Sequence, residues 1–272
     1  MKIGLIGAGR MGRPILDRLA AAGHATKVLV RQPEAREAAL AAELDFATTI
    51  VDTVREADIV FCVVLNDAQV REVCLGPRGA IAAMKPGAVL VQHTTSDPET
   101  AQLLGVAAAE RGVHVLDAAL SGGPHDIAAA RLTLWVGGDA ALLDELRPVL
   151  AAYAEPILFV GPLGNGQKVK LVNNALFVSQ VGLAVEAVRL AGALGIDEAA
   201  ILAALQHGSG ASRGLAVVAS GGSVAALAPR IGALMAKDVA TVRAVAQNAG
   251  VDLGVIGTVL ASDTVGRDVL GG

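Results

Sequence analysis

Aromatic residues are scarce in this chain of 272 residues: they make up 2% of it, while hydrophobic residues of all kinds make up 53%. The core must therefore be packed mainly with alanine, valine and leucine, a composition typical of a globular protein with alanine-rich helices. The length is sufficient for one large domain or two smaller ones.

Cysteine is scarce too. Cys62 and Cys74 are too few for a disulfide framework, and Cys62 lies within the apolar run of residues 59–64. We therefore expect two reduced thiols, as in a cytoplasmic protein.

The chain also lacks an excess of positive charge and a long apolar run. The formal net charge is −4 and no basic run occurs, which argues against nucleic acid or an anionic membrane as a partner. The apolar residues 3–6 are too few for the core of a signal peptide. Residues 214–228 are apolar but contain three glycines, so we expect a packed helix and turn there and no membrane span.

The first 160 residues alternate short apolar runs with alanine-rich stretches of helical pattern. We expect strands at residues 2–6, 25–30, 59–64, 88–92, 113–116, 132–136 and 157–160. Helices are expected at residues 11–22, 34–43, 68–74, 97–111 and 140–152. This alternation predicts βαβ units, and the near-continuous apolar strands predict a mostly parallel α/β sheet that is covered on both faces.

The pattern changes at the breaker cluster of residues 161–166, after which no convincing strand follows. Residues 166–194 are typical of one long helix. Further helices are expected at residues 197–207, 223–236, 237–249 and 252–265. We predict an N-terminal domain of residues 1–162 and an all-α C-terminal domain of residues 163–272.

The first expected strand ends in the turn Gly7-Ala8-Gly9-Arg10-Met11-Gly12, which opens the first expected helix. In a dinucleotide-binding turn, the first glycine permits the bend, the second admits the pyrophosphate, and the third allows close packing of helix and strand. The phosphates would meet free N–H groups at the helix N-terminus. The alternative is a glycine-rich turn without a ligand; the strand before it and the helix after it favour the cofactor site.

The residue that follows the second strand distinguishes NADP from NAD in such sites. That strand ends at Val30 and is followed by Arg31, with no carboxylate before Glu34. A guanidinium suits a 2′-phosphate, so we expect NADP, with NAD the weaker alternative. Arg10 and Arg36 either assist or are ordinary solvated arginines.

Three polar segments follow later strands at the edge where open α/β sheets bind ligands. They are Leu65-Asn66-Asp67, the hydroxyl-rich residues 93–96, which include Thr95, and residues 117–123, which end in Ser121-Gly122-Gly123. Hydroxyls suit a ribose or a substrate, and successive backbone N–H groups suit a carboxylate. Each segment alone is equally typical of a simple turn, but their common position favours a ligand site.

The long expected helix carries polar residues among apolar ones. Lys170, Asn173 and Asn174 share one helix face by their spacing, whereas Lys168 points away. A lysine in a dry cleft can have its pKa lowered far enough to move a proton at neutral pH. The alternative is a lysine–asparagine cluster that caps a domain junction.

Four motifs occur in an order typical of one family: the glycine turn, residues 117–123, Gly166-x-x-x-Lys170-x-x-Asn173-Asn174, and Lys237-Asp238. By these motifs the whole chain resembles the β-hydroxyacid dehydrogenase family, which includes 3-hydroxyisobutyrate dehydrogenase and tartronate semialdehyde reductase. The resemblance implies a Rossmann domain, a long interdomain helix and a helical C-terminal domain, assembled as a homodimer or homotetramer. It implies hydride transfer between NAD(P) and a small 3-hydroxy acid or its semialdehyde, without a metal.

The resemblance also implies roles for single residues. Lys170 would be the catalytic acid/base, and Asn174 would hold Lys170 and the substrate, with Asn173 beside it. Ser121, Gly122 and Gly123 would bind the substrate carboxylate, and Thr95 would lie by the nicotinamide ribose. Lys237 would close over the cofactor, with Asp238 as its neighbour. Leu65 and Asn66, by their position after a strand, are expected to border the cofactor.

Some residues depart from the family pattern. Ala119 and Leu120 replace a common Pro-Val, residues 124–126 (Pro-His-Asp) follow the glycines where small residues are usual, and His93-Thr94 replaces Met-Ser. The C-terminal domain lacks the aromatics that often close the substrate pocket. His125 either lines the pocket or lies on the surface, so the substrate is left open.

Two other functions are compatible with such a fold. Imine reductases share the fold and the cofactor but tend to carry Asp or Tyr at the position of Lys170. A non-catalytic dinucleotide-binding protein would have no need for a proton donor. Retention of Lys170, Asn174 and Ser121 favours the dehydrogenase.

Overall fold

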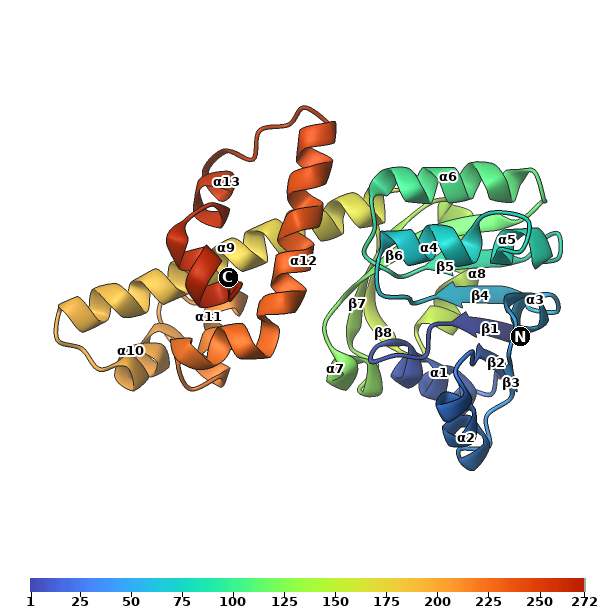
Figure 1. Cartoon of the computed structure of the whole chain (residues 1–272), viewed down its shortest axis with the longest axis horizontal. Helices are drawn as coiled ribbons and strands as arrows, with labels where there is room; N and C mark the ends of the chain where they lie inside the picture. The colour runs from blue at the N-terminus through green and yellow to red at the C-terminus, as the bar shows by residue number, and fades with distance from the viewer. Residues whose placement is uncertain (272) are drawn as a thin grey trace. The chain divides into compact units, whose positions relative to one another are not determined.

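The computed structural model of the chain describes residues 1–271 and divides into two compact units, Met1–Lys170 and Leu171–Gly272 (Figure 1). The division falls inside helix α9 (Asn165–Ala193). The boundary predicted between residues 162 and 163 lies in the turn that precedes this helix. Each unit is described below by itself.

The first unit is built on one eight-stranded sheet with the order β3-β2-β1-β4-β5-β6-β7-β8. All neighbouring strands are parallel except β6 and β7. The strands are β1 (Lys2–Ile6), β2 (Ala25–Leu29), β3 (Phe46–Ala47), β4 (Ile59–Cys62), β5 (Val89–Gln92), β6 (His114–Ser121), β7 (Leu132–Gly137) and β8 (Ala154–Phe159).

Helices cover both faces of this sheet because the central strands are apolar on both sides. One apolar core joins the sheet to α1 (Gly12–Ala21), α2 (Pro33–Ala41), α7 (Pro124–Ala128) and α8 (Ala140–Leu150). The other joins it to α3 (Ile50–Val54), α4 (Asp67–Cys74), α5 (Ala80–Ala83) and α6 (Pro98–Ala109). Figure 1 shows α4, α5 and α6 together over this second face.

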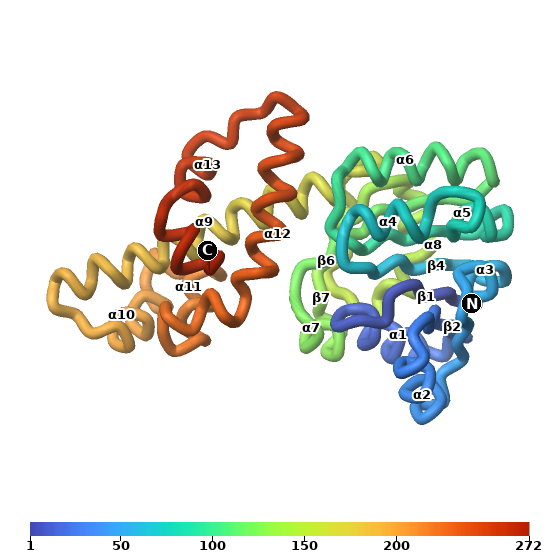
Figure 2. The backbone as a smooth tube through the Cα atoms, in the orientation of Figure 1, coloured from blue at the N-terminus to red at the C-terminus, as the bar shows by residue number. Residues whose placement is uncertain are grey.

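The second unit contains only helices within its described residues. After α9 come α10 (Glu198–Leu205), α11 (Arg213–Ser220), the short η1 (Val224–Ala226), α12 (Leu227–Asn248), α13 (Gly254–Leu260) and the π-helical η2 (Val265–Val269). The chain bends by 91° between α11 and the η1–α12 segment (Figure 2). Buried alanine, valine and leucine side chains from α9, α11, α12 and η2 form one core.

The predicted fold class, a Rossmann-type α/β domain with a long helix and a helical second domain, is confirmed. Two expectations about elements are wrong. Strand β6 continues to Ser121 instead of ending at residue 116, because β7 returns antiparallel and pairs with residues 117–121. Residues 227–248 form one helix instead of two, since Lys237 and Asp238 are compatible with a helix interior. The short elements β3, α3, α5 and α7 were not predicted, because they carry too few residues for a clear periodic pattern, whereas α11 falls within the packed helix and turn expected at residues 214–228.

Candidate active site

The predicted cofactor turn joins β1 to α1. Gly7 has φ +103°, and a Cβ there would collide with the carbonyl oxygen of Val63. A Cβ on Gly12 would collide with the carbonyl oxygen of Gly7. Gly9, in contrast, meets nothing within 4 Å. The first and third glycines are therefore required by packing, and a side chain at Gly9 would fill the open space in front of the turn where a pyrophosphate fits.

The residues around Gly9 present little besides backbone. Ala8, Gly9 and Arg10 are exposed, whereas Met11 packs against the core under the sheet. Helix α1 begins directly after them and leaves its first N–H groups at this edge. The turn thus has the form of an anion-binding cradle.

Arg31 lies at the end of β2 and is exposed. Its Nη1 is 3.5 Å from Oε1 of Glu72, a long ion pair between exposed side chains. Arg36 Nη2 donates to the carbonyl oxygen of Arg31 at 3.0 Å, while Arg36 Nε is buried with no hydrogen-bond partner within the described residues. The structure therefore brings Arg31 and Arg36 together next to the first strands.

The segment after β4 caps helix α4, a role that the sequence analysis did not predict. Asn66 Oδ1 accepts the N–H of Gln69 at 3.0 Å and caps helix α4. The N–H of Leu65 donates to Oε1 of Gln69 at 3.0 Å, and the Leu65 side chain is exposed. An Asn at the start of a helical pattern is a signal that could have predicted this cap.

The segment after β5 is joined to the segment after β4. Thr94 Oγ1 accepts the N–H of Val64 at 2.9 Å and donates to the Val64 carbonyl at 3.1 Å. Thr95 is half-buried between the bonded residues Thr94 and Ser96. Its position at the strand end is therefore fixed by its two neighbours.

A buried polar network lies beneath these strand ends. Gln167 Oε1 accepts the N–H of Ser96 at 2.9 Å, and Gln167 Nε2 donates to Gln92 Oε1 at 2.9 Å. Gln92 Nε2 donates in turn to the Thr94 carbonyl at 2.5 Å and to Ser96 Oγ at 3.2 Å. The first turn of α9 is thereby attached to the end of β5, one helical turn before Lys170.

Asp117 attaches the same helix to β6. Its Oδ1 accepts the N–H of Gly164 at 2.7 Å, and its Oδ2 accepts the N–H of Gln167 at 2.8 Å. Burial raises the pKa of Asp117 to about 6, although these N–H groups favour the carboxylate. The residue was predicted only as part of a ligand-facing segment; its partners lie about 50 positions away, beyond the reach of a local pattern.

His93 is buried under the sheet end instead of facing a ligand. Its Nδ1 lies 2.6 Å from the Ala118 carbonyl and its Nε2 lies 2.8 Å from the Tyr153 hydroxyl. A carbonyl can only accept, so Nδ1 carries the proton and Nε2 accepts from tyrosine. Burial lowers the pKa of His93 to about 4, and its ring stacks on Phe61.

The Ser-Gly-Gly segment closes β6. Ser121 is the last residue of the strand, and Gly122 has φ +127°. The N–H of Gly123 donates to Oδ2 of Asp126 at 2.8 Å. One of the N–H groups predicted for a carboxylate is thus bonded to a side chain of the chain itself.

Helix α9 carries the predicted proton donor. Lys170 is half-buried, while Lys168 is exposed, with its Nζ 3.3 Å from Asn165 Oδ1. Asn173 Nδ2 donates to Asn174 Oδ1 at 3.2 Å. Asn174 Nδ2 is buried without a hydrogen-bond partner among residues 1–271. Arg36 Nε, Thr100 Oγ1 and Ser179 Oγ are likewise buried without a hydrogen-bond partner within residues 1–271, and each such group requires a water, a ligand or a strain to explain it.

Lys237 and Asp238 lie next to each other in α12 of the second unit. The Lys237 Nζ and Asp238 Oδ1 atoms are 3.7 Å apart, and the two side chains are 33% and 16% exposed. Their helix belongs to the apolar core of that unit.

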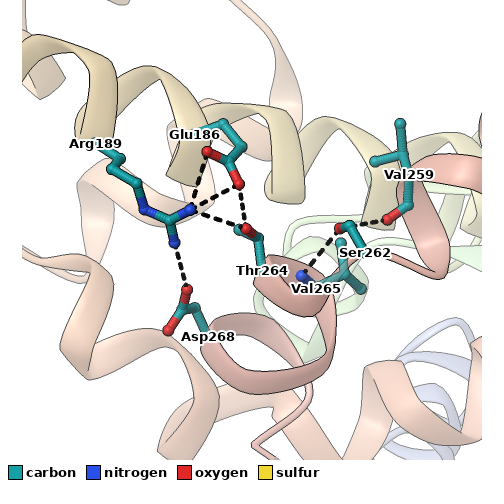
Figure 3. A network of polar contacts seen from close by, with 7 residues as sticks. All are labelled: Glu186, Arg189, Val259, Ser262, Thr264, Val265 and Asp268. Atoms are coloured by element: carbon teal, nitrogen blue, oxygen red, sulfur yellow. Dashed lines mark hydrogen bonds and ion pairs between the residues drawn. The ribbon is translucent and has the colours of Figure 1, made fainter.

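A second polar network in the helical unit serves the fold (Figure 3). Arg189 on α9 binds Glu186 on the same helix at 3.0 Å and Asp268 on η2 at 3.1 Å. The Thr264 hydroxyl bonds both Glu186 and Arg189. The network fastens the end of the described chain to α9.

Within residues 1–271, no group of three or more His, Cys, Asp or Glu side chains is placed to hold a metal ion.

Cys62 and Cys74 are both free and buried. Helix α9 is long and apolar enough to cross a membrane, but half of its apolar window is buried inside the structure, as in a core helix.

Two family models match the chain. One, described as the NAD binding domain of 6-phosphogluconate dehydrogenase, matches residues 2–161. The other, described as NAD-binding of NADP-dependent 3-hydroxyisobutyrate dehydrogenase, matches residues 164–262. The chain therefore carries nicotinamide-dinucleotide-binding regions on both sides of the turn before α9.

Relatives of known activity agree with these models. The NAD-dependent L-serine dehydrogenase of Pseudomonas aeruginosa is 35% identical over 79% of this chain and 72% of its own length. The 2-hydroxy-3-oxopropionate reductase of Escherichia coli is 32% identical over 80% of this chain and 74% of its own. The structure of Mycobacterium tuberculosis 3-hydroxyisobutyrate dehydrogenase with L-serine superposes with a TM-score of 0.84 at 26% identity, over 95% of this chain and 90% of that one.

Proposed function

Since the chain belongs to the β-hydroxyacid dehydrogenase family, and is thus an oxidoreductase that acts on a hydroxyl group, we propose that it interconverts a small 3-hydroxy acid and its semialdehyde or keto form. NADP is the proposed hydride carrier, and Lys170 is the proposed general acid/base. The observation that carries the proposal is the helix face of Lys170, Asn173 and Asn174, whose buried Asn174 Nδ2 lacks a partner among the described residues.

Lys170 moves the proton in this mechanism. During reduction its Nζ donates a proton to the carbonyl oxygen of the substrate, and during oxidation it takes the proton back from the hydroxyl. NADP, when bound, supplies or accepts the hydride. Asn174 offers its Nδ2 to a substrate oxygen, and the bond from Asn173 fixes the orientation of that amide.

The fixed start of α9 supports this role. Gly164 and Gln167 donate their N–H groups to Asp117, and the Gln167 side chain bonds Ser96. Lys170 follows Gln167 by less than one helical turn. A proton donor must be held within hydrogen-bond reach of the reacting oxygen, and an anchored helix start meets that requirement.

The proposed substrate is a small hydroxy acid whose carboxylate end meets Ser121, Gly122 and Gly123. The names of the relatives, a serine dehydrogenase and a 2-hydroxy-3-oxopropionate reductase, support compounds of this size. Asn173 is the further residue proposed to meet the substrate.

For the cofactor we propose the turn of residues 7–12 for the pyrophosphate and Thr95 for the nicotinamide ribose. Leu65 and Asn66 are proposed to border the cofactor, and Lys237 with Asp238 is proposed to bind it from its own unit. The preference for NADP rests on Arg31, because one relative is named as NAD-dependent and the relatives therefore do not decide the choice.

The assembly is part of the same proposal. Four exposed apolar side chains lie along the second-unit part of α9, three of them at intervals of seven: Val172, Leu176, Leu183 and Leu190; the exposed Leu194 follows directly after the helix. Such a stripe suits a matching surface on a second copy, so we propose a homodimer or a homotetramer. Two free buried cysteines suit a cytoplasmic location.

The test is a panel of small semialdehydes, keto acids and cyclic imines offered with NADPH, with the loss of absorbance as the measurement. We expect turnover of at least one carbonyl compound. Lys170→Ala should lower kcat on the order of 100-fold or more, the usual scale of acid–base catalysis. Lys168→Ala, two residues away and exposed, is the matched control and should retain full activity.

Robust turnover by Lys170→Ala would contradict the role of this lysine. Reduction of the imines alone would instead identify an imine reductase. Tight binding of NADPH without any turnover would indicate a dinucleotide-binding protein without catalytic activity.

A further inference from the structure

The turn after β6 holds a carboxylate of the chain itself. Asp126 Oδ2 accepts the N–H of Gly123 at 2.8 Å. A Cβ on Gly122 would lie 2.7 Å from the same oxygen. The Asp126 side chain is only 15% exposed. Its oxygen therefore engages the Gly123 N–H, one of the groups proposed for the carboxylate of the substrate.

The two oxygens of Asp126 differ in their partners. His125 Nε2 lies 3.1 Å from Oδ2, so that oxygen contacts both an N–H group and an imidazole. Oδ1 has no hydrogen bond or ion pair with any described residue. The side chain thus retains an acceptor next to the glycine turn.

A carboxylate in this position changes what the turn can bind. A second carboxylate in direct contact with Asp126 would place two like charges side by side, which disfavours the ionised pair. A hydroxyl or an ammonium group would instead meet an ionised acceptor. A hydrogen bond to a charged group is among the stronger ones in proteins.

We propose that Asp126 is a specificity-determining residue, which selects substrates that carry a hydrogen-bond donor on the carbon between the carboxylate and the reacting carbon. The donor is a hydroxyl or an ammonium group, and substrates with hydrogen or methyl there lack the bond. This inference rests on the proposed function. The Ser121 hydroxyl at the end of β6 stays available for the acid group.

A helix-capping role alone would also place Asp126 here, because its bond to Gly123 satisfies the start of α7. The two roles differ in what Asn would do at this position. In Asp126→Asn, the amide oxygen of the new side chain can still accept the N–H of Gly123, but the negative charge of the carboxylate is lost. Asp126→Gly removes both the bond and the charge.

The experiment measures kcat/KM with NADP for L-serine, glycerate, 3-hydroxypropionate and 3-hydroxyisobutyrate. The first pair carries the donor, as ammonium or hydroxyl, and the second pair does not. We expect the unaltered protein to prefer the better donor-bearing acid by about tenfold or more, the equivalent of one charged hydrogen bond. Calorimetric titration with the same four acids reports binding without turnover.

Asp126→Gly should reduce this preference to within about threefold, and Asp126→Asn should give an intermediate value. Asp139→Asn is the matched control: Asp139 caps α8 by accepting the N–H of Leu142 at 3.0 Å, and the bond is exposed. Its preference should equal that of the unaltered protein.

Several results would overturn the inference. An unchanged preference in Asp126→Gly, or an equal loss for all four acids, would reduce Asp126 to a helix cap. Turnover of the four acids by the unaltered protein without preference would refute the specificity but not the proposed function. Failure to oxidise any of the four acids would overturn the inference alone if a compound of the carbonyl panel is reduced, and would refute both proposals if none is.

Discussion

The carboxyl ends of the parallel strands are used in two different ways. At the end of β5 and in the adjacent middle of β6, Gln92, Ser96 and Asp117 are buried and bonded to each other's segments or to the start of α9. At the ends of β1 and β2, residues 8–10 and Arg31 are exposed, and a Cβ on Gly9 would meet no atom within 4 Å. Both regions lie at one edge because these strands run parallel.

We infer that the buried region supports the site and that the exposed region binds the cofactor. The polar groups of the first region are already hydrogen-bonded within the chain, and these bonds fix the start of the helix that carries Lys170. The backbone and the guanidinium of the second region are exposed, and the guanidinium has a long ion pair with Glu72, so this is the region that we propose for the cofactor. Sites of high precision combine both: groups that meet the ligand and a rigid layer behind them. Substitutions in the first region should therefore affect stability most, and substitutions in the second should affect affinity.

The largest effect is expected for Asp117→Asn. Asp117 accepts two N–H groups, one on each oxygen, whereas an asparagine amide has one acceptor and would turn an NH₂ group towards the other N–H. The free energy of unfolding should fall by about 3 kcal/mol, since a buried bond to a charged group is lost and a buried donor is left unsatisfied. Urea unfolding measures the change.

Asp139→Asn is the control for this prediction too, because Asp139 accepts an N–H in an exposed position. It should cost less than about 1 kcal/mol. Equal costs for the two variants would mean that the burial of Asp117 within β6 adds nothing, and the contrast between the two regions would fail.

The sequence predicted the exposed region better than the buried one. The turn of residues 7–12 is local: its glycine spacing, the strand before it and the helix after it are contiguous, and Gly7 and Gly12 each have a steric reason in the structure. The buried network joins Gln92, Ser96, Asp117 and Gln167, which are far apart in the chain. No periodic pattern links such residues, because only the folded topology brings them together.

His93 illustrates the same limit. The sequence analysis placed it in a hydroxyl-rich segment at a strand end, which was correct, but the direction of its side chain was not predictable from that position. Its partners, the Ala118 carbonyl and the Tyr153 hydroxyl, come from β6 and from the loop before β8. The one sequence feature that indicated burial of His93 is the apolar run of residues 88–91, which precedes Gln92 and His93.

The second largest effect is a dependence of stability on pH. The pKa of His93 is lowered to about 4 in the folded chain, so its unfolded form binds a proton first as the pH falls. Between pH 7 and pH 5 this should remove about 2 kcal/mol of stability. The pKa of Asp117 is raised to about 6, so its folded form binds the proton first and should add about 1 kcal/mol over the same range.

These two groups therefore oppose each other, and a variant can separate them. His93→Met removes the titrating ring. The stability of this variant, although lower at pH 7, should rise on acidification from pH 7 to pH 5, whereas that of the unaltered protein should fall. Urea unfolding at both pH values gives the comparison. Parallel pH dependences in the two proteins would show that His93 is not the buried neutral base described above.

The smallest of the three effects concerns the exposed region and changes affinity instead of stability. Arg31→Ala should weaken NADPH about tenfold, by loss of a charge-assisted contact to phosphate, and leave NADH nearly unchanged. Glu72→Gln should act in the opposite direction, because the Glu72 carboxylate lies 3.5 Å from Arg31 Nη1 and competes with the phosphate for it. An exposed pair of this length is weak, so we expect a gain of less than about fivefold for NADPH. Fluorescence titration with both cofactors measures these changes. Equal shifts for NADPH and NADH in Arg31→Ala would refute the preference for NADP, and they would show that the guanidinium at the end of β2 is a solvated side chain and not part of the binding region.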